Sequence, residues 1–430
     1  MIKNINIKNS VTYLIFYFSI LGVLFLLWLT GKSLLSVIIP VGTISLFLID
    51  SKIKINKSLF YSILVLLFII IINLLLFDNY EYAYDSIVKG AFLPIFVGLY
   101  FSKLKDNPIK NNIVKVLFIM LNIYCFINFF IMLKQVSTPG FMVRARSDIT
   151  YYLDMITGFV GEKGTHRLSY VYITCIYLNL IHLKSEVKKY RIFAKVFLIF
   201  NLLSSLYISA FNDNRTYYIL LALSLLPYLA LNFKLKNIKK SKLGKFVVAF
   251  ILILITSLSL YMTTPAVKKF VDENIIDQYV VTTINKLSSS KQNNTESGEE
   301  RVELLKYAVS NTNLVVGKGI GSIPLTKIES MPMHFGLNDF NVRIYTGGIP
   351  YLIIFFVIYY LFYINFFENK NKSLKVFVLL YTVFAAFYTQ SYSQIEKTFL
   401  ITLSMFVISI MYNKSKIING NNLINNDERS

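Results

Sequence analysis

Apolar runs close to the length of a membrane-spanning helix recur along nearly the whole chain, separated by short polar stretches. About 20 predominantly apolar residues in a helix cross the hydrocarbon core of a bilayer. The pattern therefore predicts an all-α polytopic membrane protein with about 12 transmembrane helices. The expected spans are 11–30, 34–50, 59–77, 87–102, 113–133, 165–183, 192–210, 215–232, 246–263, 341–366, 374–390 and 396–412.

The lysine-rich connections between these runs all fall on the same side of the membrane if each run crosses it once. The connection 78–85, on the other side, is acidic instead. Because short cytoplasmic loops carry an excess of lysine and arginine, both termini are predicted to be cytoplasmic. The lysines are Lys52, Lys54, Lys57, Lys103, Lys105, Lys110, Lys184, Lys188, Lys189, Lys234, Lys236, Lys239, Lys240, Lys242, Lys370 and Lys372.

This topology divides the chain into four parts. Residues 1–263 hold the first nine transmembrane helices, 264–340 form a large extracytoplasmic loop, 341–412 hold the last three helices, and 413–430 are a cytoplasmic tail. A long loop without secondary structure is uncommon in a compact protein, so we expect the extracytoplasmic loop to fold on the membrane surface. Within it, 301–311 has the apolar spacing of an amphipathic helix.

Composition supports the membrane assignment, since 55% of the residues are hydrophobic and 16% are charged. The formal net charge of +21 could suggest a nucleic-acid partner, but the positions of the lysines explain much of it as topology, and we expect no nucleic acid. Cys125 and Cys175 lie inside apolar runs, which excludes a disulfide framework and a Cys-rich metal site. No His, Asp or Glu spacing is typical of a metal site, and we expect no cofactor.

The arginines stand apart from the lysines. The chain has 36 lysines and 8 arginines, and most of the arginines fall on the predicted outer side, against the positive-inside rule. A guanidinium binds phosphate or carboxylate through two parallel hydrogen bonds, so these arginines fit an anionic ligand, such as a diphosphate-linked lipid, at the outer leaflet. The alternative is that each arginine reaches lipid headgroups or pairs with a nearby acid. The outer arginines are Arg144, Arg146, Arg167, Arg215, Arg301 and Arg343.

Both interpretations stay open for Arg144, Arg146 and Arg167. For Arg215 the functional one is favoured, because "AFNDNRTYYI" (210–219) confines it with Asp213 to a short turn between two spans. Asp213 could then be its structural partner.

A glycine-rich run, "VVGKGIGS" (315–322), lies in the same outer loop. It lacks the spacing and the Lys-Ser/Thr ending of a phosphate-binding P-loop, so it predicts a turn that lets backbone approach a ligand or a helix. Lys318 is a further candidate anion contact. Among the histidines, His182 is interpreted as structural, His166 is ambiguous, and His334 could titrate near neutral pH.

Charged and amide side chains enter the tenth span together in "LNDFNVRIYTGGI" (337–349). Asp339 and Arg343 are four residues apart and therefore share one helix face, where they form either a plain ion pair or one wall of a polar site that also includes Asn338. Gly347 and Gly348 would let a neighbouring helix or lipid approach closely.

The order of these motifs resembles the O-antigen polymerase and ligase superfamily of bacterial glycosyltransferases. The resemblance rests on the Asn/Asp-Arg turn at 213–216, the Arg-led outer helix at 301–310, the "GKGIGS" turn and "LNDFNVRIYTGGI". These motifs occupy residues 213–349, and the hydropathy profile is similar over the whole chain.

The resemblance implies a fold of the GT-C type in the bacterial inner membrane. It implies a donor and an acceptor that are both undecaprenyl-diphosphate-linked oligosaccharides, repeat units of a polysaccharide such as O-antigen lipopolysaccharide or capsule. Besides membrane lipid, a chain-length regulator protein is a candidate partner. The resemblance also implies that Arg215 and Arg301 grip the donor diphosphate.

In ligases of this superfamily a His immediately precedes the Asn or Ser of the last motif. This chain has Leu337 there, with His334 three residues earlier, so the resemblance favours a polymerase over a ligase. If the acceptor hydroxyl needs a general base, the candidates in order are Asp339, His334 and Glu300. A flippase or transporter of the lipid-linked glycan is an alternative, which would carry polar or Gly/Pro-broken groups near the middle of several spans. A membrane scaffold is another, but it would not need outward arginines.

Overall fold

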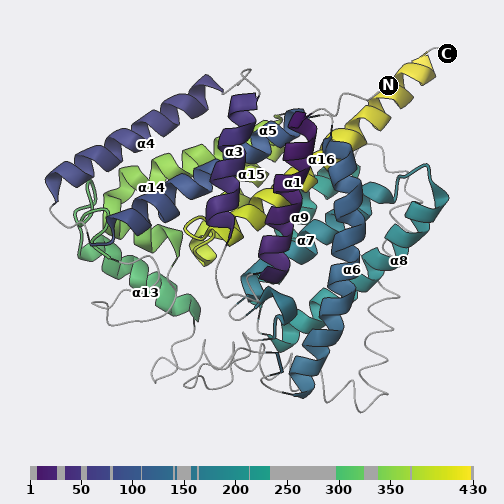
Figure 1. Ribbon diagram of the computed structural model, residues 1–430, viewed down its shortest axis with the longest axis horizontal. Coiled ribbons are helices and arrows are strands. Elements are labelled where there is room, and N and C mark those ends of the chain that lie inside the picture. Colours follow the sequence, from purple (N-terminus) through teal and green to yellow (C-terminus); the bar gives the residue numbers. More distant parts are fainter. Residues whose placement is uncertain are drawn as a thin grey trace.

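The computed structural model describes residues 7–26, 34–49, 56–77, 81–107, 109–138, 141–142, 156–161, 164–212, 214–232, 297–323, 338–368 and 370–427. Within these residues the chain is helical and holds no β-strand, and an isolated bridge joins Asn313 to Gly317. Figure 1 shows α4 and α13 at one margin of the helical bundle and α8 at the other.

The helices follow the predicted spans. Every predicted span except 246–263 coincides with a helix, and 246–263 lies outside the described residues. The predicted amphipathic helix at 301–311 is confirmed as α13, which begins a few residues earlier. The elements are α1 (Ile7–Leu21), η1 (Gly22–Leu26), α3 (Leu35–Ile49), α4 (Lys57–Leu76), η2 (Asp85–Phe92), α5 (Leu93–Asp106), α6 (Lys110–Ser137), η4 (Gly158–Val160), α7 (Thr165–His182), α8 (Lys188–Phe211), α9 (Arg215–Asn232), α13 (Ser297–Ser310), α14 (Asp339–Phe366), α15 (Lys372–Tyr388) and α16 (Ile395–Asp427).

Among the described residues, 6 helices are long and apolar enough to cross a membrane. This supports a helical membrane protein, while the full set of about 12 spans stays a prediction. Two shorter helices, Ser10–Phe25 and Leu35–Ser45, are also apolar. The candidate spans are Lys57–Leu76, Asp85–Asp106, Lys110–Ser137, Lys188–Phe211, Asp339–Phe366 and Ile395–Asn413.

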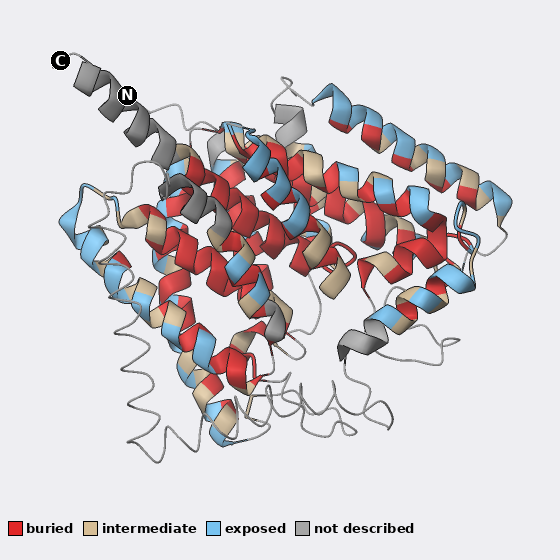
Figure 2. Cartoon of the chain, turned by 180° about the vertical axis from the view of Figure 1, so that it is seen from behind, coloured by how far each residue is buried: buried red, intermediate tan, exposed pale blue. Residues whose placement is uncertain are grey.

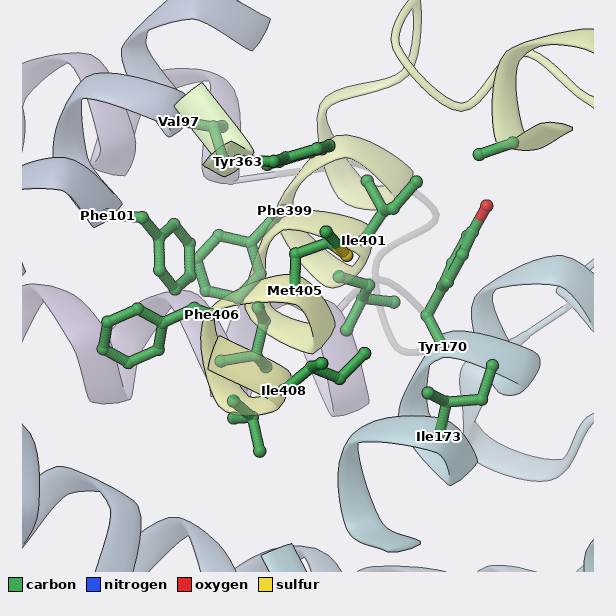
Figure 3. Packing of buried hydrophobic residues seen from close by; sticks show 14 of the residues in the cluster. Val97, Phe101, Tyr170, Ile173, Tyr363, Phe399, Ile401, Met405, Phe406 and Ile408 are labelled. Atoms are coloured by element: carbon green, nitrogen blue, oxygen red, sulfur yellow. The ribbon is translucent and has the colours of Figure 1, made fainter. Parts of the chain in front are cut away.

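The core of the bundle is built around α16 and α7. In the apolar stretch of α16, 94% of the residues are buried, against 28% in α4 at the margin (Figure 2). On one side of α16, Phe101 of α5 packs against Phe399 and Phe406, with ring centroids 5.3 and 5.6 Å apart. Tyr170 and Ile173 of α7 lie on the other side (Figure 3). A helix enclosed by other helices tolerates polar side chains that a lipid-facing helix does not. This explains why the enclosed α7 is less apolar than the marginal α4.

A polar cluster in the interior joins α6, α7 and α8. Asn122 of α6 accepts hydrogen bonds from Asn179 of α7 (2.9 Å) and Asn201 of α8 (2.8 Å). The thiol of Cys175 donates to the same oxygen at 3.4 Å. All four side chains are buried, so each hydrogen bond links helices where neither lipid nor water competes. Cys125 and Cys175 are both free and buried.

The helix α14 is interrupted at Gly348, whose φ of 76° and ψ of −177° are not helical. The segment 313–323 packs against this break. An interruption leaves backbone carbonyl and N–H groups without their helical partners, and the segment supplies those partners. The bonds run from Lys318 N to Tyr345 O (2.8 Å), from Gly319 N to Thr346 O (3.0 Å) and from Ile349 N to Leu314 O (2.8 Å).

This docking explains the glycines of the "VVGKGIGS" run. Gly317 has a φ of 71°, and a Cβ there would lie 2.5 Å from the carbonyl carbon of Thr346. Gly321 has a φ of 105°, and its Cβ would lie 2.6 Å from the backbone nitrogen of Ala83. In this run the glycines let the backbone pack directly against the backbone of other helices. Of the two partners expected for the run, a ligand or a helix, the structure shows a helix.

We expect Gly317→Ala to destabilise the protein. The substitution combines a left-handed φ with a backbone clash, and strain of this kind costs about 1–3 kcal/mol. Thermal unfolding of the purified protein in detergent measures the loss. The matched control is Gly22→Ala, because a Cβ at Gly22 meets only Leu35 Cδ2, at 3.8 Å. Equal unfolding temperatures for the two variants would contradict the docking.

Candidate functional site

Several of the helix ends that the lysine pattern assigns to the outside are joined by side-chain contacts. We call the starts of α7, α9, α14 and α16 and the end of α15 the outer rim. Asn214, just before α9, donates hydrogen bonds to Thr165 O (2.9 Å) and Ser169 Oγ (2.7 Å) at the start of α7. The ring of His166 packs edge-on against Tyr388 at the end of α15, with centroids 5.9 Å apart. The rim is therefore tied by specific contacts.

At the start of α14, Asp339 is completely buried. Its Oδ2 accepts a hydrogen bond from the backbone N–H of Tyr392 (2.8 Å), and its Oδ1 accepts one from the hydroxyl of Ser393 (2.5 Å). Asn338 caps the same helix, because its side-chain oxygen accepts from Asn341 N at 2.8 Å. Both carboxylate oxygens of Asp339 are thus engaged by protein groups.

Arg343, one turn along α14, is 2% exposed and is also held by protein groups. Its Nη2 donates to Gly90 O at 2.8 Å and lies 3.9 Å from Asp339 Oδ1. The guanidinium carbon lies 3.2 Å from the ring centre of Phe355. This geometry favours the ion-pair interpretation of the two residues over the catalytic one, because both side chains are buried and hydrogen-bonded to protein groups.

The segment "TQSYSQ" (389–394), between α15 and α16, connects the rim, and sequence reasoning missed it. Its Tyr392 and Ser393 hold Asp339, as above, and Ser391 Oγ lies 3.0 Å from the hydroxyl of Tyr170 on α7. Thr389 Oγ1 accepts from Lys397 of α16 at 2.8 Å. The available signal was a wholly polar connection without lysine between two apolar runs.

Basic side chains outnumber acidic ones at the starts of α7, α14 and α16. Arg167 is partly buried and interacts electrostatically with the carboxylate of Glu396. Lys397 is 8% exposed. With Arg343 opposite Asp339, this part of the rim holds one more basic than acidic side chain, which suits it to lie next to an anion. Both interpretations of Arg167 therefore stay open, since it lies near an acidic side chain and in a part of the rim where basic side chains outnumber acidic ones.

The other predicted site residues are placed to different extents. Lys318 is exposed, and its ammonium lies 5.4 Å from the ring centre of Tyr345. Arg215 is the first residue of α9, and Glu300 and Arg301 lie in the first turns of α13, but only their backbones are described. The remaining candidates lie outside the described residues, namely Arg146, His334, Asp213, Arg144 and Leu337.

Two contacts place α13 beside the rim. Leu304 and Ala308 of α13 are buried in one cluster with Ile344 and Tyr345 of α14. The arginine-led start of α13 therefore belongs to a helix that packs on the first half of α14. His182 lies away from this region, stacked on Phe118 with ring centroids 3.9 Å apart, which fits its structural interpretation.

Within the described residues, His, Cys, Asp and Glu side chains form no group of three or more that could hold a metal ion. Comparison of the chain with protein-family models, with curated proteins and with solved structures finds no match.

We expect a strong energetic coupling between Asp339 and Arg343. Breaking a buried pair leaves an uncompensated charge and costs about 3–5 kcal/mol. Asp339→Asn and Arg343→Gln should each lower the unfolding temperature in detergent, and the double variant should lose less than the sum of the two.

The control for this double-mutant comparison is the pair of variants Asp85→Asn and Lys89→Gln, singly and combined. That pair is also spaced i, i+4 and is closer, at 2.6 Å, but its side chains are 39% and 53% exposed. An exposed pair contributes about 0.2–1 kcal/mol. If Asp339→Asn leaves stability unchanged and removes only activity, the structural assignment is wrong.

Proposed function

We propose that the chain is a polysaccharide polymerase of the bacterial cell membrane. It transfers a glycan from undecaprenyl diphosphate to the acceptor sugar of another lipid-linked repeat unit, at the outer face of the membrane. The proposal includes about 12 spans, a GT-C-like arrangement and cytoplasmic termini, as the apolar runs and the lysine pattern predict.

One observation carries the proposal: α7 and α9, which each have an arginine in the first turn, are joined by hydrogen bonds at the same end of the bundle. The hydrogen bonds of Asn214 join the start of α9, with Arg215, to the start of α7, with Arg167 nearby. A helix start favours negative charge, and a guanidinium fork adds two parallel hydrogen bonds to a phosphate. The combination fits a diphosphate that stays at the membrane surface with its lipid.

The chemistry needs no nucleotide sugar. The acceptor hydroxyl oxygen forms a bond to the anomeric carbon of the donor glycan, and the bond from that carbon to the diphosphate oxygen breaks. The arginines stabilise the negative charge that develops on the leaving diphosphate. The hydroxyl proton goes to a general base. Because the oxygens of Asp339 are engaged by the 389–394 segment, His334 and Glu300 are the proposed bases, and Asp339 holds the rim in shape.

We expect Arg215→Lys and Arg301→Lys to lose most polymer at normal expression. Lysine keeps the charge but cannot form the bidentate contact. Each variant is returned to a strain that lacks the chromosomal copy, and the glycan chain-length ladder is read. The matched control is Arg191→Lys, an exposed arginine in the first turn of α8, at the opposite end of that helix from the rim.

The ladder also separates the polymerase from the ligase alternative. Loss of the ladder with a single unit retained supports a polymerase, whereas loss of all attached units indicates a ligase. Wild-type chain lengths in both arginine variants would show that Arg215 and Arg301 do not bind the diphosphate through bidentate contacts.

Transport of the lipid-linked glycan is the second candidate, favoured by the interruption of α14 at Gly348. Transporters use broken helices to bind substrates near the middle of the membrane. Here, however, the freed backbone groups Tyr345 O, Thr346 O and Ile349 N are all bonded to the 313–323 segment. The break is therefore occupied by the protein itself.

Elongation in detergent distinguishes the two candidates. A polymerase needs no separated compartments, so purified protein with lipid-linked repeat units in micelles should release undecaprenyl diphosphate and form longer glycans. A transporter requires two sides of a membrane and would leave the units unchanged. Arg215→Lys serves as the low-activity reference in the same assay, and absence of any elongation by the wild-type protein would contradict the polymerase proposal.

A further inference from the structure

We propose that residues 313–323 form a re-entrant element that dips into the outer half of the bilayer, with Leu314 and Val315 among the lipid acyl chains. The partner of this surface is the hydrocarbon of the membrane. The inference rests on the depth, exposure and hydrogen bonding of the segment and does not depend on the glycosyltransferase proposal.

The depth of the segment follows from Asn73 on α4. The side chain of Asn73 is 2% exposed and binds the segment twice, donating to Val316 O (2.6 Å) and accepting from Ile320 N (2.5 Å). Asn73 lies within the apolar run of α4, and Ile71 and Leu75 on either side of it are 54% and 80% exposed. Apolar side chains so exposed on a candidate span face lipid. The backbone of the segment at Val316 therefore lies at a lipid-exposed level of α4.

The apolar tip of the segment is continuous with the lipid-facing surface of α14. Val315 is 67% exposed and Leu314 is 38% exposed. The backbone of Leu314 bonds to Ile349, which begins the exposed apolar face of α14 that continues at Ile353 (55% exposed). A surface of this kind, set between two lipid-facing helices, is covered by acyl chains rather than by water.

The backbone of the segment meets the condition for non-helical chain at this depth. Irregular backbone is tolerated inside a membrane only where protein groups satisfy its hydrogen bonds. The segment bonds to Tyr345, Thr346 and Ile349 of α14 and to Asn73 of α4, and Gly321 O accepts from Tyr82 N at 3.1 Å. The tip thus presents side chains to lipid while much of its backbone is paired with protein.

The polar flank of the tip has the composition of a membrane interface. Lys318 is exposed and lies over the ring of Tyr345, which stacks on Tyr307 of α13 with centroids 6.4 Å apart. Tyrosine rings and lysine ammonium groups are typical of the headgroup level. The segment is apolar at 314–316 and cationic at 318. This order fits a short turn whose apolar residues lie below the headgroup level while Lys318 stays at it.

The test uses tryptophan fluorescence, because the chain has a single tryptophan, Trp28. In a Trp28→Phe background, Val315→Trp is reconstituted into phosphatidylcholine vesicles with or without brominated acyl chains. Bromine quenches only tryptophan that contacts the acyl chains, so Val315→Trp should lose most of its emission. Leu314→Trp gives a second reading if the first variant does not elute as a single species.

Two matched variants calibrate the result. Leu75→Trp on α4 should be quenched as strongly, whereas Lys306→Trp on the exposed face of α13 should keep its emission in both vesicles. Quenching of Val315→Trp no greater than that of Lys306→Trp overturns the proposal. An unquenched Leu75→Trp also overturns it, because the depth argument requires α4 to face lipid.

Discussion

A helix that is interrupted inside a membrane leaves backbone groups that lipid cannot satisfy, and the architecture around α14 depends on meeting that constraint. The interruption at Gly348 frees carbonyls before it and N–H groups after it, and each such group left unpaired costs several kcal/mol. The 313–323 segment supplies the partners, but only because its own glycines allow backbone to approach backbone. The positions of α13 and α4 follow, since both are attached to this segment.

A second constraint is the cost of charge away from water. Asp339 and Arg343 lie at the start of a candidate span, where an isolated charge is unfavourable. Their separation of 3.9 Å makes the ion pair itself long, so the closer hydrogen bonds from Tyr392, Ser393 and to Gly90 are as important as the pair. These bonds connect α14 to the 389–394 segment and to η2. The two buried charges therefore fix the position of the start of α14 relative to these two neighbours.

The sequence predicted the helices well because the period and length of apolar runs are local properties. It also placed Asp339 and Arg343 on one helix face, since a spacing of four residues is enough for that inference. It did not predict which groups would bind them, because Gly90 and Ser393 are distant in the chain and individually unremarkable. The 389–394 segment was missed for the same reason, and the glycines of "VVGKGIGS" predicted close approach without identifying α14 as the partner.

In the proposed function, the hydrogen bonds at the outer rim would hold arginines on separate helices at a fixed spacing for one ligand. A diphosphate bound by forks from different helix starts requires those starts to keep a fixed spacing, since bidentate contacts tolerate little displacement. Asn214 bonds α9 to α7, and Asp339 bonds α14 to the 389–394 segment that precedes α16. The first half of α14 is held at its start by Asp339 and at its end by the 313–323 segment, and α13 packs on that half through Leu304 and Ala308. Neutral amides, a buried carboxylate and glycines therefore set the geometry of the rim, and the proposed function assigns the anionic substrate to the arginines at the starts of α9 and α13.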